Sequence, residues 1–277
     1  MGELSYQDAC LSIRVGADEV EILSERLWQL GTLGIEERSV GMEVQLIAGF
    51  DSAVAADFAA ARLKKFAVVE EFASGTHLDH WRNFATIYRA GNRLDVKPPW
   101  VAYEPNPVEL IIWIDSGRSF GSGSHPSTRL ALAELEQLLE GNESLLDVGC
   151  GSGILSVAAA RLGAIDVLGI DIDPSAMRVT EENARANGVE EFVRCSIMPL
   201  EEVDGSYDVV VANMLASTLI QNADVLIKRV RAGGRLVISG ILESQIGIIS
   251  EVMKPLKVLK AQQDETITGS WVCLCFG

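Results

Sequence analysis

The sequence predicts an α/β protein in which a small α+β domain precedes a doubly wound, mostly parallel sheet. Two observations carry this prediction. Residues 1–72 combine short strand-like segments, in which polar and apolar residues alternate, with two helical segments. From residue 109 onward, apolar strand segments alternate with helical segments, which is the pattern of a parallel sheet covered by helices.

Residues 1–72 follow the order strand, helix, strand, strand, helix, strand. Leu11, Ile13 and Val15 alternate with polar positions in the first strand. The later segments are, in order, ADEVEILSERLWQL, GIEERSV, EVQLIA, SAVAADFAAARLKKF and AVVEEF. This order predicts a ferredoxin-like domain, and no cluster of catalytic residue types accompanies it.

Residues 73–108 are expected to form a linker. The segment LDHWRNFATIYRAG, residues 78–91, has a helical pattern, and Trp81 and Trp100 are expected to pack between the domains. Prolines then stiffen the chain and prevent helix formation. They are Pro98, Pro99, Pro105 and Pro107.

Residues 109–277 form the second predicted domain. Its strand candidates are ELIIWID, SLLDVG, DVLGIDI, EFVRCS, YDVVVANM, GRLVISGI and SWVCLCF. Helices are expected at 126–140, 152–162, 174–187, 216–231 and 243–253. No helical pattern is found in 255–277, which we expect to form an antiparallel hairpin at the edge of the sheet.

The composition is that of a soluble globular protein, with 48% hydrophobic and 22% charged residues. No apolar run reaches the roughly 18 residues that a membrane span requires. The first residues, MGELSYQDAC, do not match a secretory signal, so a cytoplasmic protein is expected.

The net charge is −16, from 23 basic and 39 acidic residues, which disfavours binding to a nucleic-acid backbone and permits attraction to a basic protein. Five scattered cysteines argue against a disulfide framework. With three histidines and no second Cys or His pair at ligand spacing, we expect no metal site. The sequence carries no signal for an oligomeric state.

A glycine-rich turn follows the strand segment in LLDVGCGSG, residues 145–153. Gly149, Gly151 and Gly153 allow a backbone that approaches a ligand closely. The dinucleotide fingerprint G-x-G-x-x-G has a third glycine where this chain has Ile154, which disfavours a nicotinamide enzyme. Asp147 precedes the turn.

An acidic residue follows the next strand segment, about 20 residues further on. This residue, Asp171, is expected to accept hydrogen bonds from the ribose hydroxyls of an adenosine. Asp173 is instead expected to cap the helix that begins at Pro174. The turn and Asp171 together indicate a class I methyltransferase that uses S-adenosylmethionine.

Asn213 ends the strand segment in YDVVVANML, residues 207–215. Its amide oxygen can accept a hydrogen bond from a substrate N–H, or the side chain can satisfy the backbone of the turn. Its place at the carboxyl end of a strand of the cofactor domain favours the substrate role.

A second glycine-rich stretch, FGSGSHPST, covers residues 120–128. Ser124 and Pro126 suit a helix start, whose free N–H groups, with the Thr128 hydroxyl, are expected to bind the amino-acid end of S-adenosylmethionine. The glycines are expected to let the turn fold over the cofactor. For His125 we expect a structural role.

These motifs, together with NARANGV and LVISGIL, resemble the bacterial methyltransferases of large-subunit ribosomal protein L11. The resemblance runs from about Ile112 to Leu242, and the segment Gly121–Thr128 has serine at three positions where the family has threonine. It implies a small substrate-recognition domain, a linker and a catalytic domain that uses S-adenosylmethionine to methylate lysine side chains and the N-terminal amine of a basic ribosomal protein.

Carried over residue by residue, the resemblance implies cofactor contacts at Thr128, Gly149, Gly151, Asp171 and Asn213, with Asn213 also catalytic. Two alternatives stay open at this point. The first is that the chain methylates lysine in another protein, such as an electron-transfer flavoprotein subunit. The second is that it is a module that binds S-adenosylmethionine without turnover.

Overall fold

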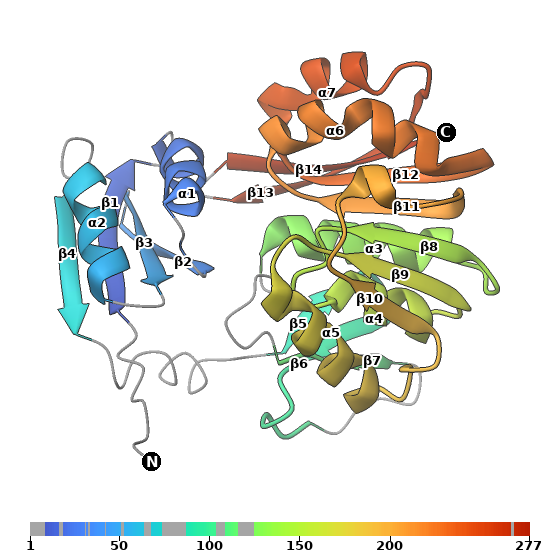
Figure 1. The fold of residues 1–277 in the computed structure, drawn as a ribbon, viewed down its shortest axis with the longest axis horizontal. Helices are drawn as coiled ribbons and strands as arrows, with labels where there is room; N and C mark the ends of the chain where they lie inside the picture. Colours follow the sequence, from blue (N-terminus) through green and yellow to red (C-terminus); the bar gives the residue numbers. More distant parts are fainter. Residues whose placement is uncertain are drawn as a thin grey trace. The chain divides into compact units, whose positions relative to one another are not determined.

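The computed structural model describes a large part of the chain, in two compact units. The first unit consists mainly of the chain up to Ala85, and the second begins at Thr86 (Figure 1). The described residues are 9–16, 19–30, 32, 34–41, 43–50, 53–63, 68–73, 87–103, 109–115, 125–266 and 269–277.

The first unit has the predicted order of elements. They are β1 (Ala9–Gly16), α1 (Val20–Gln29), β2 (Gly34–Val40), β3 (Glu43–Phe50), α2 (Ala53–Leu63) and β4 (Val68–Ala73). The strand order is β2-β3-β1-β4, and each neighbouring pair is antiparallel. Leu11, Ile13 and Val15 are buried, because alternate residues of a strand face the same side. The ferredoxin-like prediction is confirmed.

The second unit alternates strands and helices from residue 126 onward. Its elements before that point are β5 (Tyr88–Ala90), β6 (Leu94–Lys97) and β7 (Leu110–Trp113). The following elements are α3 (Pro126–Leu138), β8 (Ser144–Val148), α4 (Ile154–Arg161), β9 (Asp166–Ile170), α5 (Pro174–Ala186), β10 (Val193–Ser196), β11 (Tyr207–Asn213), α6 (Ala216–Arg229), β12 (Val230–Leu242), α7 (Ile246–Val252), β13 (Val258–Thr266) and β14 (Gly269–Phe276). Short 3₁₀ turns cover Leu200–Glu202 and Glu243–Gln245.

Within the described residues, the main sheet has the strand order β10-β9-β8-β11-β12-β14-β13. The strands from β10 to β12 are parallel, whereas β14 is antiparallel to β12. Lys257 and Gly277 exchange both backbone hydrogen bonds, at 3.0 Å each, which is the pattern of an antiparallel pair. The doubly wound sheet and the predicted hairpin at its edge are therefore confirmed.

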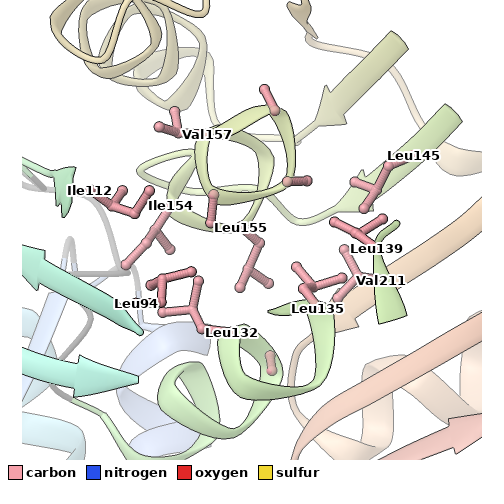
Figure 2. Packing of buried hydrophobic residues seen from close by; sticks show 14 of the residues in the cluster. Leu94, Ile112, Leu132, Leu135, Leu139, Leu145, Ile154, Leu155, Val157 and Val211 are labelled. Carbon is pink, nitrogen blue, oxygen red and sulfur yellow. The ribbon is translucent and has the colours of Figure 1, made fainter. Parts of the chain in front are cut away.

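Helices cover both faces of this sheet. One core joins residues of α3, α4 and the small sheet β5–β7 to β8 and β11, and Figure 2 shows Leu132 and Leu135 of α3 close to Leu155 of α4. The other core joins α6 and α7 to the opposite face. The strand order reverses between β8 and β11, and such a point is where doubly wound sheets bind ligands, at the carboxyl ends of the strands.

The linker prediction for 73–108 is wrong over residues 88–97. These residues form β5 and β6, and β6 pairs in parallel with β7. Leu94 and Val96 are completely buried, so the burial of apolar side chains stabilises this segment as strands. The prolines come after Lys97 and do not interfere with these strands. The helix expected at 78–91 is likewise wrong at residues 88–90, and its first part, with Trp81, lies outside the described residues.

The other predicted boundaries agree closely, with small differences at helix ends. The helix expected at 216–231 ends at Arg229, and β12 begins directly at Val230. The helix expected at 243–253 divides into a 3₁₀ turn and α7. Among the helices that the structure describes, none combines the length and the apolar character needed to cross a membrane.

The separate core of the first unit leads to a first prediction. Leu46 is completely buried in that core. Leu46→Ala is expected to lower the free energy of unfolding by about 2–5 kcal/mol, because it leaves a cavity. Affinity for S-adenosylmethionine, measured by calorimetry, is expected to change less than about twofold, because Leu46 belongs to a hydrophobic core separate from that of the second unit, which carries the predicted cofactor residues. Leu145→Ala, in the core of the second unit, is the comparison. If Leu46→Ala loses as much affinity for S-adenosylmethionine as Leu145→Ala does, the prediction is contradicted.

Candidate functional site

The sequence-predicted site residues meet at one edge of the main sheet. Val148 at the end of β8 pairs with Ile170 at the end of β9 and with Ala212 of β11. The glycine-rich turn, Asp171 and Asn213 therefore leave the sheet at the same level. This edge includes the place where the strand order reverses, so the candidate site lies where the fold predicts a ligand.

The turn after β8 depends on left-handed backbone at three positions. Gly149, Gly151 and Gly153 have φ of 74°, 54° and 75°. The N–H groups of Gly149 and Cys150 both donate to the carbonyl of Ile170, at 2.8 and 3.0 Å. A Cβ at Gly153 would lie 2.6 Å from the side chain of Thr180. Glycine is required here both by the backbone angle and by the close packing of α5.

Asp171 lies directly beside this turn. Its Oδ2 accepts a hydrogen bond from the N–H of Gly151 at 2.9 Å, and its Oδ1 accepts one from the N–H of Asp173 at 2.9 Å. These bonds orient a half-buried carboxylate that can still accept hydrogen bonds, since each oxygen has two lone pairs. Asp173 caps α5 by accepting from the N–H of Ser175 at 2.8 Å, as predicted.

Asp147 is a buried carboxylate at the start of the turn. Its Oδ2 accepts from the N–H and the hydroxyl of Ser156, at 3.0 and 2.7 Å, whereas its Oδ1 has no partner among the described residues. Burial raises the pKa of Asp147 to about 7. The sequence placed this residue before the turn but assigned it no role, because the burial of one oxygen cannot be seen in a sequence.

Asn213 and Thr128 are brought into direct contact from distant parts of the chain. The Asn213 amide nitrogen donates to the hydroxyl of Thr128 at 3.1 Å. Thr128 lies on α3 and is buried, and the hydroxyl of Ser239 on β12 donates to the carbonyl of Ser127 at 2.8 Å. These contacts attach the start of α3 to the carboxyl ends of β11 and β12.

Gly240 and Met214 complete the surroundings of Asn213. A Cβ at Gly240 would lie 2.5 Å from the carbonyl oxygen of Met214 and 3.0 Å from the amide oxygen of Asn213. A Cβ at Gly149 would lie 3.4 Å from the Met214 side chain, so the residue after Asn213 packs against the turn. Sequence reasoning missed Gly240, although a glycine inside a strand pattern is a signal of close backbone approach.

His125 takes the capping role that the sequence assigned to Ser124. It is the N-cap of α3, its Nδ1 accepts from the N–H of Ser127 at 3.2 Å, and Pro126 follows at the first turn. Burial, with a smaller contribution from Arg129, lowers the pKa of His125 to about 4. A neutral ring packed edge-on against Trp271 supports the structural role expected for it. Gly121 to Ser124 lie outside the described residues.

The structure thus brings Gly149, Gly151, Asp171, Thr128 and Asn213 to one edge of the sheet. Among the described residues, no group of histidine, cysteine and acidic side chains has the arrangement of a metal site. A cavity of about 600 Å³ between α5 and β10 is lined by none of these five residues. The candidate chemistry therefore belongs to the carboxyl ends of β8, β9 and β11.

The residues of this edge fit S-adenosylmethionine. The unpartnered Oδ1 of Asp147 is a buried acceptor, and the cofactor carries ammonium and hydroxyl donors. The turn has no Cβ at Gly149, Gly151 or Gly153, which permits close approach of a ligand to the backbone. Asp171 has the acceptor chemistry that ribose hydroxyls require.

The buried Asp147 leads to a second prediction. Its pKa is about 7 in the folded protein and 3.8 in the unfolded chain, so between these values only the folded state keeps the proton. The contribution of Asp147 to stability therefore falls as the pH rises from about 4 to about 7. Asp147→Asn removes this dependence. The free energy of unfolding of the variant, relative to that of the wild type, is therefore expected to increase as the pH rises from about 4 to about 7.

Chemical denaturation of both proteins at pH 5 and pH 8, without cofactor, measures this difference. Comparing the variant with the wild type cancels the contribution of His125, whose lowered pKa has the opposite effect: stability is lost as the pH falls from about 6.5 to about 4. A stability difference that is the same at both pH values contradicts the assignment.

Comparison with known proteins agrees with this geometry. The family model "Ribosomal protein L11 methyltransferase (PrmA)" matches residues 13–277. A ribosomal protein L11 methyltransferase from Syntrophotalea carbinolica is 42% identical over 204 residues, which cover 72% of this chain and 65% of the relative. A relative of the same name from Cupriavidus taiwanensis is 45% identical over 186 residues, covering 67% of this chain and 60% of the relative.

The chain therefore spans somewhat less than two thirds of the length of these curated relatives. A crystal structure of a ribosomal protein L11 methylase from Lactobacillus delbrueckii subsp. bulgaricus is similar with a TM-score of 0.63 and 31% identity. The similarity covers 69% of this chain and 97% of that structure. The family model covers nearly the whole sequence, and the chain belongs to the ribosomal protein L11 methyltransferase family.

Proposed function

We propose that this protein is an S-adenosylmethionine-dependent N-methyltransferase that acts on ribosomal protein L11. The observation that supports it best is the position of Asn213, which ends β11 at the level of the glycine-rich turn and contacts Thr128. An amide beside a cofactor site is a group that can orient an amine. Membership of the family supports the same reaction and substrate.

S-adenosylmethionine supplies an electrophilic methyl group when it is bound. In this proposal, Asp171 accepts hydrogen bonds from the ribose, the turn from Gly149 to Gly153 approaches the cofactor with its backbone, and Thr128 lies at the amino-acid end. Two contacts support these roles: the bond from the Gly151 N–H to Asp171, and the bond from Asn213 to Thr128. The first bond orients the Asp171 carboxylate and the second orients the Asn213 amide before any ligand binds.

Asn213 orients the attacking nitrogen in this proposal. Its amide nitrogen is engaged by Thr128, which directs the amide oxygen, an acceptor, to the N–H of a neutral substrate amine. The nitrogen lone pair attacks the methyl carbon, the carbon–sulfur bond breaks with its electron pair going to sulfur, and the methylated nitrogen then loses a proton to water. Alignment of this kind can lower a barrier by about 7–11 kcal/mol in favourable cases.

The substrate amines are lysine side chains and the N-terminal α-amine of the ribosomal protein. We assign the recognition of this protein to the first unit, and the net charge of −16 favours a basic partner. A cytoplasmic location is part of the same proposal, because a ribosomal protein is synthesised and assembled there.

The first test of this function is intact-mass analysis of purified ribosomal protein L11 after incubation with the enzyme and S-adenosylmethionine. Mass increases in steps of about 14 Da are expected, one for each methyl group added. Asn213→Ala is expected to lower the rate about 100-fold, because it removes the group that aligns the amine.

Asn222→Ala is the matched control, since Asn222 lies on α6 and donates to the carbonyl of Thr218 within the same helix. It is expected to methylate at the wild-type rate. If the wild type binds S-adenosylmethionine but adds no mass to L11, the substrate assignment is wrong. Mass increases on another protein, such as an electron-transfer flavoprotein subunit, would then identify a different lysine methyltransferase, and turnover of no protein would indicate a binding module.

A second test concerns the ribose. Asp171→Ala is expected to weaken binding of S-adenosylmethionine about tenfold or more, because hydrogen bonds to a carboxylate are among the stronger ones. Asp173→Ala removes only the cap of α5, so it is expected to lower thermal stability without a comparable loss of affinity. Calorimetric titration of both variants measures this contrast, and an Asp171→Ala variant with full affinity would refute the ribose assignment.

A further inference from the structure

Helix α5 and its C-cap residue present three buried polar side chains to the backbone of other elements. Thr180, Asn183 and Asn187 follow one another at helical spacing and are 0%, 3% and 7% exposed. A buried polar side chain lowers stability unless it is hydrogen-bonded, so the partners of these residues show what their burial achieves.

Asn183 connects two segments that are distant in the sequence. Its Oδ1 accepts from the N–H of Asp115 at 3.0 Å, and its Nδ2 donates to the carbonyl of Asp115 at 3.0 Å. The same Nδ2 donates to the carbonyl of Ser152, in the glycine-rich turn, at 2.8 Å. One amide therefore binds both the chain just after β7 and the turn.

Thr180 makes the matching contact one residue earlier in the turn. Its hydroxyl donates to the carbonyl of Gly151 at 3.3 Å. The N–H of the same residue, Gly151, donates to Asp171. Because α5 binds the carbonyls of Gly151 and Ser152, the orientation of these two peptide units depends on side chains of this helix, and the N–H that bonds Asp171 lies in the peptide unit directly before them.

We infer that Asn183 is a positioning residue for the cofactor, acting through the backbone of the glycine-rich turn. Its side chain holds the Ser152 carbonyl and the Asp115 backbone at a fixed separation, so that the turn is arranged for the ligand before the ligand binds. This inference rests on the proposed function in one respect, namely that the turn binds S-adenosylmethionine.

Asn187, the C-cap of α5, shows what a purely structural asparagine looks like beside Asn183. Its Oδ1 accepts from the N–H of Trp113 at 2.9 Å, and its Nδ2 donates to the carbonyl of Trp113 at 2.6 Å. This is the same two-bond contact to backbone that Asn183 makes with Asp115. The remaining bond of the Asn187 side chain goes to the carbonyl of Asn183 rather than to the turn. The two residues therefore differ in the bond to Ser152.

The test compares Asn183→Ala with the matched control Asn187→Ala in the 277-residue chain. Both variants lose buried hydrogen bonds and are expected to lower the melting temperature by similar amounts. Asn183→Ala is expected to raise the Kd for S-adenosylmethionine about tenfold or more, whereas Asn187→Ala is expected to change it less than about twofold. In methylation assays, the KM for the cofactor is expected to rise in Asn183→Ala much more than kcat falls.

Amide hydrogen exchange without cofactor gives a second readout that does not depend on the proposed function. The amides of residues 151–153 are expected to exchange faster in Asn183→Ala than in Asn187→Ala, because only the first variant releases the turn. If Asn183→Ala does not fold, Asn183→Asp replaces it. That side chain has the same shape and keeps an acceptor for the Asp115 N–H, but it cannot donate to Ser152.

Equal changes of Kd and of exchange in the Asn183 and Asn187 variants overturn the inference. The proposed function and the positioning role of Asn183 are tested separately. A wild-type protein that does not bind S-adenosylmethionine contradicts the proposed function, and the exchange data then still decide whether Asn183 arranges the turn. A wild-type protein that binds the cofactor, with no loss of affinity in Asn183→Ala, contradicts only the positioning role.

Discussion

Helix α5 packs against the turn after β8 so closely that Gly153 has no room for a Cβ, and the site is arranged around this contact. A Cβ at Gly153 would lie 2.6 Å from Thr180, and left-handed backbone at Gly149 and Gly151 bends the chain from β8 into α4. The carbonyls of the turn then meet polar side chains of α5, while the N–H of Gly151 meets Asp171. The close packing at Gly153 therefore helps to orient the carbonyls and the N–H group of the turn that bond to α5 and to Asp171.

The parallel sheet explains why residues so far apart in sequence are brought to this turn. Neighbouring parallel strands end at the same edge, so Asp171 and Asn213 leave the sheet beside the turn. The ordered arrangement has an energetic cost that is visible at Asp147, whose burial raises its pKa to about 7 and leaves one oxygen without a partner in the described chain. Unfavourable burial of this kind is typical of sites arranged for a ligand rather than for stability.

The sequence predicted most of the second unit because its apolar strands and amphipathic helices have distinct periodicities. It also predicted Gly149, Gly151, Thr128, Asp171 and Asn213 as site residues, and the structure brings these to one edge. It missed β5 and β6, since the four buried residues of β6 include Asp95 and Lys97, whose charges resemble those of a linker. It missed the roles of Asn183 and Gly240, because these depend on contacts with the backbone of distant segments, which no local pattern encodes.

A crystal structure of the protein with S-adenosylhomocysteine, the product of methyl transfer, tests the central claim most directly. The account predicts the ribose hydroxyls within hydrogen-bond distance of Asp171, with the amino-acid end between Thr128 and the turn from Gly149 to Gly153. Density for the ligand elsewhere, for instance in the cavity between α5 and β10, with Asp171 bonded only to Gly151 and Asp173, would contradict the assignment of the site.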